Sequence, residues 1–246
     1  MKKTVVITGT SRGYGKALAE ALLIKGCNVI GASRTPFIYD YCDNSIYKKY
    51  CHILTDIGDM DSLSRFVLQI KSICTSVDTL INNAATSEGV SPIESISVNT
   101  WKTVFDVNLF SHIEITRALL PLLKKGVNPS IINVCSLSAF KPLKLLGPYC
   151  VSKAALKHYS LCLANELEAD RIRVNAIGIS ADTQLQRTHA EEKKRLGYTD
   201  SWKKMQNNPP PSIESNVDLA LFLVSDNSKY ITGQYIEAHS MGTPTW

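Results

Sequence analysis

The stretch VVITGTSRGYGKALAEALLIK, residues 5–25, predicts how the chain begins to fold. A short β-branched strand, a loop with three glycines and a helix follow one another without interruption. Glycine lets the loop turn tightly and approach a pyrophosphate, and the helix N-terminus offers free N–H groups and a positive dipole end to that anion. The order of strand, loop and helix therefore predicts a dinucleotide site, although the spacing Gly-x-x-x-Gly-x-Gly differs from the usual fingerprint. The expected ligands are Gly9, Ser11, Arg12, Gly13, Tyr14 and Gly15.

Beyond this stretch, β-branched runs alternate with longer helical patterns, which is typical of β-α-β units in a parallel sheet. Several runs are apolar throughout, as expected for strands that helices cover on both faces. We expect strands at 5–8, 28–32, 52–54, 79–82, 130–134, 173–177 and 234–237, and helices near 15–25, 60–72, 101–107, 109–124, 149–168 and 214–224. The predicted fold class is α/β, with residues 1–246 forming one Rossmann-type domain around a doubly wound parallel sheet.

The amino-acid composition limits the classes of protein to which this chain can belong. The chain has 246 residues, 44% hydrophobic and 20% charged, which is typical of a globular protein and excludes disorder and coiled coils. Its net charge of +5 is dispersed in short pairs, so we predict neither nucleic-acid nor membrane binding. No apolar run approaches the ~18 residues that span a bilayer. Seven cysteines without Cys-x-x-Cys spacing indicate reduced thiols in a cytoplasmic protein, and we identify no metal ligands.

Residues 180–212 interrupt the α/β pattern. They are polar and charged, and three prolines close the segment. A segment of this length without a strand pattern is usually either disordered or a functional lid. Tyr198, Trp202 and Met205 recur at i, i+4 and i+7, which would give a short helix one apolar face. That face either packs permanently on the core or closes over a substrate pocket, and the sequence leaves both interpretations open.

Tyr149 and Lys153 stand four residues apart at the start of a predicted helix, so their side chains share one face. An ammonium group beside a phenol favours the phenolate and lowers its pKa toward the working range of a general acid. In a chain of this composition such a pair arises by chance about once, so the spacing alone is uninformative. The Tyr149–Lys153 spacing becomes informative only in combination with the other motifs.

These motifs follow the glycine loop in one order. They are Asn82-Asn83-Ala84-Ala85, Asn108, Ser136 thirteen residues before Tyr149, Tyr149-x-x-x-Lys153, Arg173-Val174-Asn175-Ala176 and Ile231-Thr232-Gly233-Gln234. Together they closely resemble the short-chain dehydrogenase/reductase family, from Thr4 to about Glu237. Several motifs in register are far more specific than any one of them.

The resemblance implies four catalytic residues. Tyr149 would protonate a carbonyl oxygen as hydride arrives from the nicotinamide, or act as the base in the reverse direction. Lys153 would lower the pKa of that tyrosine and hold the ribose hydroxyls. Ser136 would donate a hydrogen bond to the same carbonyl oxygen, with Ser138 as a local competitor. Asn108 would hold a water in a proton relay, or else bond its own backbone.

The choice of cofactor depends on the end of the second strand. NAD-specific sites commonly place an acidic residue there to hold the ribose 2′-hydroxyl. Here that position is Ser33, eighteen residues after Gly15, and Arg34 follows. Arg34 and Arg12 are two guanidinium groups suited to a 2′-phosphate, so we predict NADP(H).

Other cofactor contacts follow from the resemblance. Asp56 and Ile57 stand where the family contacts the adenine, Asn82 and Ala84 where it lines the adenosine ribose, and Gly178, Ile179 and Thr183 near the nicotinamide. Two departures stand out. Gly178-Ile179-Ser180 replaces a Pro-Gly pair around the nicotinamide, and His239-Ser240-Met241-Gly242 replaces Asp-Gly-Gly in the usual region of subunit contact.

The leading function is an NADPH-dependent carbonyl reductase that transfers a hydride to a small ketone or aldehyde, reversibly with the alcohol. Residues 137–147 would line an apolar wall of the substrate pocket. The family's members often form homodimers or homotetramers, here through helices near 109–124 and 149–168. Two alternatives remain: a cofactor-binding regulatory module without turnover, and a dehydratase or isomerase on the same fold.

Overall fold

The computed structural model describes residues 2–38 and 48–238. Seven parallel strands form one sheet in the order β3-β2-β1-β4-β5-β6-β7. The strands are β1 (Thr4–Thr8), β2 (Asn28–Ser33), β3 (Tyr50–Leu54), β4 (Thr79–Asn82), β5 (Ser130–Ser136), β6 (Arg173–Ile179) and β7 (Gln234–Ala238). All seven predicted strands are confirmed, and the fold class is α/β with a doubly wound parallel sheet.

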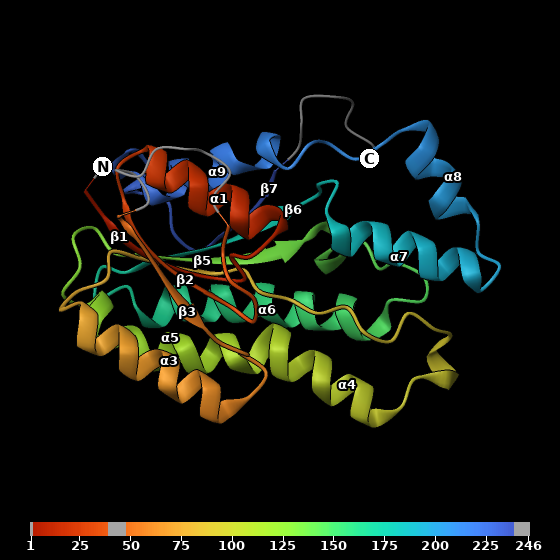
Figure 1. Cartoon of the computed structure of the whole chain (residues 1–246), viewed down its shortest axis with the longest axis horizontal. Coiled ribbons are helices and arrows are strands. Elements are labelled where there is room, and N and C mark those ends of the chain that lie inside the picture. Colours follow the sequence, from red (N-terminus) through yellow and green to blue (C-terminus); the bar gives the residue numbers. More distant parts are fainter. Residues whose placement is uncertain (1, 39–47, 239–246) are drawn as a thin grey trace.

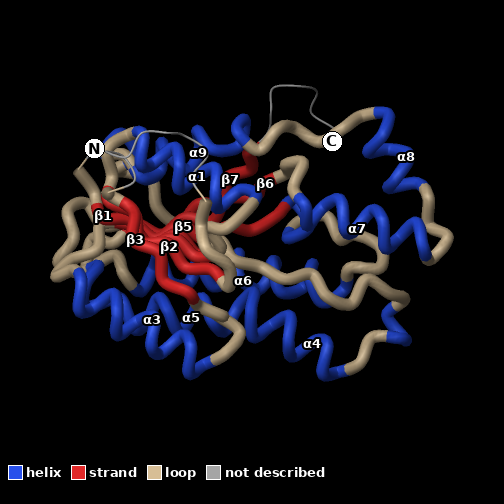
Figure 2. The backbone as a smooth tube through the Cα atoms, in the orientation of Figure 1, coloured by secondary structure: helices blue, strands red, loops and turns tan. Residues whose placement is uncertain are grey.

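Helices cover both faces of the sheet (Figures 1 and 2). Helices α1 (Gly13–Ile24) and α9 (Val217–Val224) lie above it in Figure 1, while α3 (Met60–Ile73), α5 (Ser111–Leu123) and α6 (Gly147–Glu166) lie below. Helix α4 (Val98–Phe105) extends the lower layer toward the carboxyl ends of the strands. Helices α7 (Gln184–Arg195) and α8 (Asp200–Asn207) project beyond that edge.

Each helical layer seals its own hydrophobic core. Under one face, Phe66 of α3 and Leu119 of α5 pack on Leu80 and other fully buried strand residues. On the opposite face, Leu18 of α1 and Val224 of α9 pack in the same way. The central strands are buried on both faces, which explains why their sequences are continuously apolar rather than alternating.

The chain reverses its winding direction between β1 and β4, which are neighbours in the sheet. Residues 9–12 leave β1 and Asn83 leaves β4 at this point, so both lie at the carboxyl edge of the sheet. In open α/β sheets, ligands bind outside the carboxyl ends of the strands at such a switch point. The topology therefore positions the glycine loop where a ligand site is expected.

Several helix boundaries differ from the predictions. Helix α4 begins at Val98, three residues early, because the Ser97 hydroxyl accepts a hydrogen bond from the Thr100 N–H and caps it. Segment 180–212 contains two helices, but Tyr198 precedes α8, so the expected three-residue apolar face is not one helix. The motif at 239–242 lies outside the described residues.

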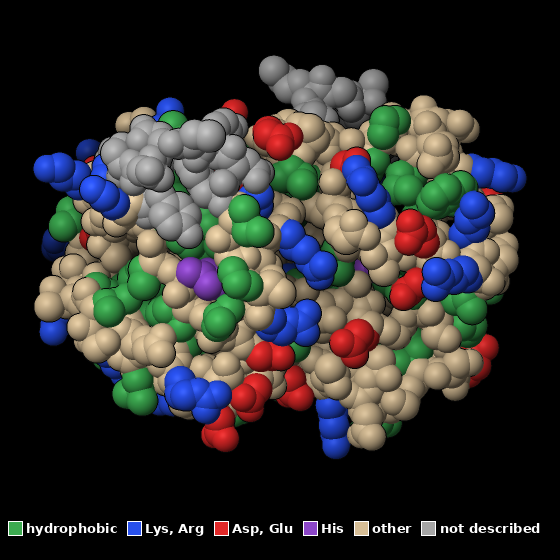
Figure 3. Space-filling model, in the orientation of Figure 1, with side chains coloured by type: hydrophobic (Ala, Val, Ile, Leu, Met, Phe, Trp, Pro, Cys, Tyr) green, Lys and Arg blue, Asp and Glu red, His purple; other side chains and the backbone are tan. Residues whose placement is uncertain are grey.

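On the face shown in Figure 3, basic and acidic side chains are interspersed rather than gathered into one basic patch. Across the described ranges, no helix is both long enough and apolar enough to cross a bilayer.

Candidate active site

The glycine loop needs its glycines for backbone reasons. Gly9 has a φ of +77°, in the region that side chains other than glycine rarely adopt. A Cβ on Gly15 would lie 2.2 Å from the Gly9 carbonyl oxygen and 2.3 Å from Asn83 Nδ2. The loop and the start of α1 therefore pack more closely than any side chain would allow.

Asn83 and Thr8 fasten this loop to the end of β4. Asn83 Nδ2 donates to the Thr8 carbonyl oxygen at 2.8 Å and to the Gly9 carbonyl oxygen at 3.2 Å. In return, the Thr8 hydroxyl accepts from the backbone N–H groups of Asn83 and Ala84, both at 3.0 Å. Our sequence prediction missed both side chains as site residues. The sequence did contain a signal, the Asn82-Asn83 pair, but we expected Asn82 rather than Asn83 to be its site residue.

Asn82 instead lies wholly inside the protein. Its Nδ2 donates to Thr116 Oγ1 at 3.1 Å and to Asn133 Oδ1 at 2.8 Å, which ties β4 to α5 and β5. The Ala84 carbonyl oxygen pairs at 3.0 Å with Nε2 of His112, a fully buried histidine whose pKa burial lowers to about 3. Asn82 therefore stabilises the interior of the sheet near its carboxyl edge, whereas the backbone of Ala84 is part of that edge.

Helix α1 begins within the glycine loop, at Gly13, so its first N–H groups belong to that loop. Arg12 is the N-cap in extended conformation, and its side chain does not cap the helix. Tyr14 turns its ring into the core and donates its hydroxyl proton to the Asn216 carbonyl oxygen at 3.1 Å. Burial raises the pKa of that phenol. Tyr14 is therefore placed to offer a ligand its backbone N–H rather than its side chain.

A polar network joins the glycine loop to the first half of β3 and to the end of β2. Tyr50 Oη is 2.9 Å from Thr10 Oγ1 and 3.0 Å from His52 Nδ1, and His52 Nε2 is 3.5 Å from Ser33 Oγ. Ser33 is buried and donates its hydroxyl proton to the Thr35 carbonyl oxygen at 2.8 Å. This network joins the glycine loop to the predicted 2′-position, and the sequence analysis missed Tyr50 and His52.

Both predicted phosphate ligands are exposed at this end of the molecule. Within the described residues, the guanidinium groups of Arg12 and Arg34 form no hydrogen bond and no ion pair. Asp56 is exposed too, and its Oδ1 accepts from the Gly58 N–H at 3.0 Å, whereas Ile57 is buried in the core. The two guanidinium groups are therefore available to an anion from solution.

Tyr149 occupies the first turn of α6, where burial raises the pKa of its phenol to about 12. A side-chain hydrogen bond with Ser136, at the end of β5, lowers that pKa. Ser136 Oγ also accepts from the Ser138 N–H at 3.2 Å. Ser138, the competitor, is buried, and its hydroxyl lacks a partner within the described residues. Ser136 is thus the serine that meets Tyr149.

Lys153 lies one turn further along α6 and is 1% exposed. Its Nζ donates to the Val134 carbonyl oxygen at 2.8 Å, and burial lowers its pKa to about 8. We expected this ammonium group to lower the pKa of Tyr149. In the protein alone, burial instead raises the pKa of Tyr149, and the Ser136 hydroxyl is the group that lowers it.

Asn108 lies in a π-helical turn, Asp106–Phe110, between α4 and α5. Single π turns within α-helices occur frequently at functional sites. The Asn108 amide binds both backbone groups of Thr86 at 2.8 Å, and its Nδ2 also donates to Ser152 Oγ at 3.0 Å. Ser152 Oγ donates in turn to the Tyr149 carbonyl oxygen at 2.8 Å. Asn108 therefore joins the loop after β4 to the turn that carries Tyr149.

The departure at Gly178-Ile179-Ser180 has a steric reason. A Cβ on Gly178 would lie 2.2 Å from the Tyr235 hydroxyl oxygen, and Gly178 has no positive φ. Tyr235 uses that space to donate its hydroxyl proton to the Ser136 carbonyl oxygen at 3.0 Å. Gly178 is therefore needed to admit the Tyr235 ring rather than to provide an unusual backbone conformation. Ile179 pairs with Ser136 in the sheet, and the Thr183 hydroxyl caps α7.

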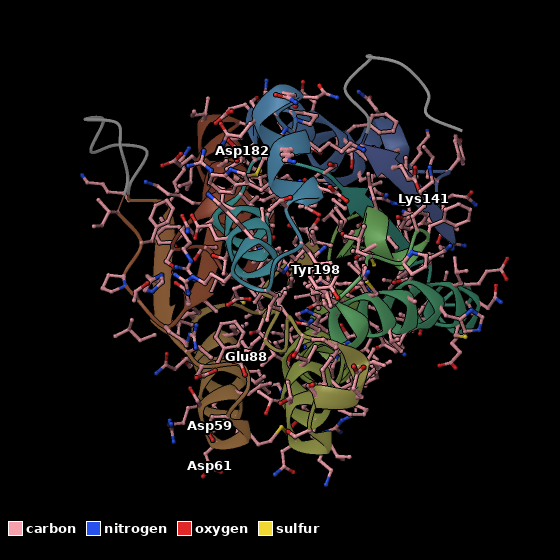
Figure 4. All side chains as sticks on the ribbon, turned by 90° about the vertical axis from the view of Figure 1, so that its right-hand side faces the viewer. Asp59, Asp61, Glu88, Lys141, Asp182 and Tyr198 are labelled. Carbon is pink, nitrogen blue, oxygen red and sulfur yellow. The ribbon has the colours of Figure 1, made fainter. Side chains whose placement is uncertain are left out.

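Helix α7 contacts the N-terminal end of α6. The rings of His189 and Tyr149 meet edge to face, with centroids 5.4 Å apart. Lys144 Nζ lies 4.4 Å from the centroid of the Tyr198 ring, which ties the loop after β5 to segment 180–212. Figure 4 looks onto this edge of the molecule, with Tyr198 near its centre.

Together these residues place a protonated phenol, a hydroxyl and a buried amine at the same edge of the sheet as a loop suited to a pyrophosphate. A neutral phenol is a proton donor, and a hydroxyl beside it stabilises negative charge on a reacting oxygen. The sequence profile of the short chain dehydrogenase family matches residues 3–194.

Individual proteins agree with that match. The uncharacterized oxidoreductase YhxC of Bacillus subtilis is 31% identical over 247 residues, covering 96% of this chain and 83% of that protein. Benzil reductase ((S)-benzoin forming) of Saccharomyces cerevisiae is 31% identical over 211 residues, covering 81% and 79%. The structure of L-sorbose reductase from Gluconobacter frateurii, complexed with NADPH and L-sorbose, has a TM-score of 0.84 at 26% identity, covering 96% of this chain and 94% of that one.

Proposed function

This chain belongs to the short chain dehydrogenase family, and from that premise we propose that it is an NADPH-dependent reductase of a ketone or aldehyde carbonyl. As a family member it is an oxidoreductase that uses a nicotinamide cofactor and acts on a small molecule. The observation that carries the finer proposal is the buried Tyr149 phenol, one turn from Lys153, with the Ser136 hydroxyl lowering its pKa against the larger effect of burial.

The residues present fit a dinucleotide. The close approach of Gly15 to Gly9 leaves the N-terminus of α1 bare, and the N–H groups of its first turn are suited to a pyrophosphate. Asn83 holds this loop in place through its hydrogen bonds to the Thr8 and Gly9 carbonyl oxygens. When bound, the cofactor supplies the hydride.

Tyr149 would donate the proton to the carbonyl oxygen. Its raised pKa keeps the phenol protonated at neutral pH, which suits reduction. Ser136 would donate a hydrogen bond to the same oxygen and stabilise the charge that grows on it. Below about pH 8, Lys153 is charged, and this charge would stabilise the phenolate that remains after proton transfer.

The preference for NADP(H) over NAD(H) rests on charge. Arg12 and Arg34 are exposed and unpaired within the described residues, and Ser33 stands where an acidic residue would repel a 2′-phosphate. The similar L-sorbose reductase was solved with NADPH, which agrees with this choice.

The proposal also covers a lid over the site, the oligomeric state and the location of the enzyme in the cell. Residues 180–212 would act as a lid, since α8 has no fully buried residue and α7 contacts Tyr149. A homodimer or homotetramer would form through α5 and α6, where Phe110 and Val151 expose apolar surface. The six described cysteines are free thiols, which supports a reducing, cytoplasmic location.

The proposal is tested by mixing the protein with NADPH and a panel of ketones and aldehydes, and following loss of NADPH and formation of alcohol. We expect equal amounts of NADP⁺ and alcohol. Binding of NADPH without turnover of any panel member would contradict the proposal in favour of a regulatory module, and product without NADPH loss would favour a dehydratase or isomerase.

A further inference from the structure

One face of α7 carries two titratable side chains that the proposed proton transfer does not use. Leu185, His189 and Lys193 stand four residues apart, so they lie on the same side of the helix. Leu185 packs against the small cluster that contains Tyr149 and Cys150, and His189 touches the Tyr149 ring. This face of α7 therefore covers the proposed proton donor.

Neither polar group on this face is satisfied by the protein. His189 is 9% exposed, and within the described residues its Nε2 is buried without a hydrogen-bond partner. Lys193 is 7% exposed, and no carboxylate of the described chain pairs with it. A buried polar atom without a partner costs free energy, so His189 Nε2, with the unpaired Lys193 ammonium one turn further along the helix, indicates a partner from outside the chain.

The charges around these groups point to an anion. Burial lowers the pKa of Lys193, and it also lowers that of His189 to about 4, with a further contribution from the Lys193 charge. Two of the acidic side chains labelled in Figure 4, Asp182 and Glu88, are engaged elsewhere. Asp182 receives two hydrogen bonds from Arg187, and Glu88 accepts one from Thr86. A negatively charged group from a ligand would offset the free-energy cost of burying the Lys193 ammonium group.

We propose that the substrate carries an anionic group, a carboxylate in the first instance, which Lys193 and His189 bind while Tyr149 protonates the carbonyl. The inference rests on the proposed function, because Tyr149 defines where the carbonyl lies. An ammonium and an imidazole N–H one helical turn apart match the two oxygens of a carboxylate. The substrate class is therefore a keto acid or the corresponding hydroxy acid, rather than a neutral ketone.

Binding is measured by calorimetry with saturating NADP⁺, so that a ketone binds without being reduced. The probes are acetoacetate, levulinate and the methyl ester of each, together with dihydroxyacetone and its phosphate. We expect the best keto acid to bind tenfold to a hundredfold more tightly than its ester, the range for a charge-assisted hydrogen bond. Tighter binding of the phosphate than of either acid would support the anion site with a phosphorylated carbonyl compound as its ligand.

Variants assign the effect to α7. Lys193→Gln should bring acid and ester affinities within about twofold of each other, and Lys193→Arg should restore part of the preference. His189→Phe keeps a ring against Tyr149 but removes Nε2, and should weaken the acid alone. Arg195→Gln is the matched control, because it removes the same charge from an exposed position of the same helix and should leave the preference unchanged.

Two results would overturn the inference: equal affinity of the unmutated protein for acids, phosphate and their neutral partners, or an acid preference that survives Lys193→Gln. Its failure is distinguishable from failure of the proposed function. A preference for anions without any NADPH turnover would contradict the reductase and support the anion site. Turnover of neutral ketones with no preference for anions would do the reverse.

Discussion

The glycine loop and segment 180–212 lie at the same edge of the sheet but are held in different ways. Thr8 and Asn83 fix the loop through four hydrogen bonds to or from main-chain groups. The segment meets the rest of the chain through side-chain contacts, among them His189 against the Tyr149 ring and Lys144 over the Tyr198 ring. The proposed cofactor-binding loop is thus bonded to the strand ends of the sheet, whereas the proposed substrate-binding segment is a separate unit that contacts the edge of the sheet.

The largest effect is expected where the two regions meet. Tyr149→Phe keeps the ring against His189 and removes the dissociable proton. Turnover should fall by about 10²–10⁴-fold, the usual cost of lost proton transfer, while NADPH affinity changes little. Steady-state kinetics and NADPH titration measure both, with Tyr230→Phe, an exposed tyrosine, as control. Unchanged turnover would remove Tyr149 from the mechanism.

The next effect concerns the cofactor side alone. The unmutated enzyme should prefer NADPH over NADH by on the order of 10²-fold in kcat/KM, because two guanidinium groups meet the 2′-phosphate. Arg12→Ala with Arg34→Ala should weaken NADPH and leave NADH nearly unchanged, and Ser33→Asp should reverse the preference. Equal kinetics with both cofactors in the unmutated enzyme would mean that both arginines face solvent.

Hydrogen exchange compares the two regions directly. Backbone amides of α8 should exchange readily in the apo protein and gain about tenfold protection when cofactor and ligand bind, because few buried contacts hold this helix. Amides of β1 and β4 should be protected throughout. Strong protection of α8 in the apo protein would instead identify residues 180–212 as permanent core.

The smallest effect is a stability change on acidification. Burial lowers the pKa of His112 to about 3 and that of His189 to about 4, against about 6.5 in the unfolded chain. Between these values the unfolded state binds more protons, so the free energy of unfolding falls as pH falls. Urea unfolding near pH 7 and pH 5 should show this loss, and His189→Phe should reduce it by about 1–2 kcal/mol. An identical loss in the variant would mean that His189 is not buried as a neutral ring.

The sheet was predictable because each strand has a sequence pattern of its own. Val5 to Ile7 and Leu80 to Ile81 are β-branched or aliphatic runs, and both are fully buried. The glycine loop was equally predictable, since Gly9 needs a positive φ that few other residues adopt. Such signals depend on the residues themselves and on nothing distant in the chain.

Other parts of the candidate site depend on pairings that no local pattern reveals. His52 meets Ser33 because β2 and β3 pair in one register, and His189 meets Tyr149 because α7 folds back on α6. Burial, another tertiary property, reverses the expected shift of the Tyr149 pKa. Helix α7 itself left a local signal that we missed: Thr183 as its cap and a basic last turn before Gly197.

The most direct test of the account follows a labelled hydride. NADPH that carries deuterium at the transferable position is incubated with the protein and its best carbonyl probe, and the alcohol is analysed by mass spectrometry. The account predicts one deuterium on the former carbonyl carbon, one NADP⁺ for each alcohol, and little labelled product with Tyr149→Phe. Product without deuterium, or equally fast labelling by Tyr149→Phe, would contradict it.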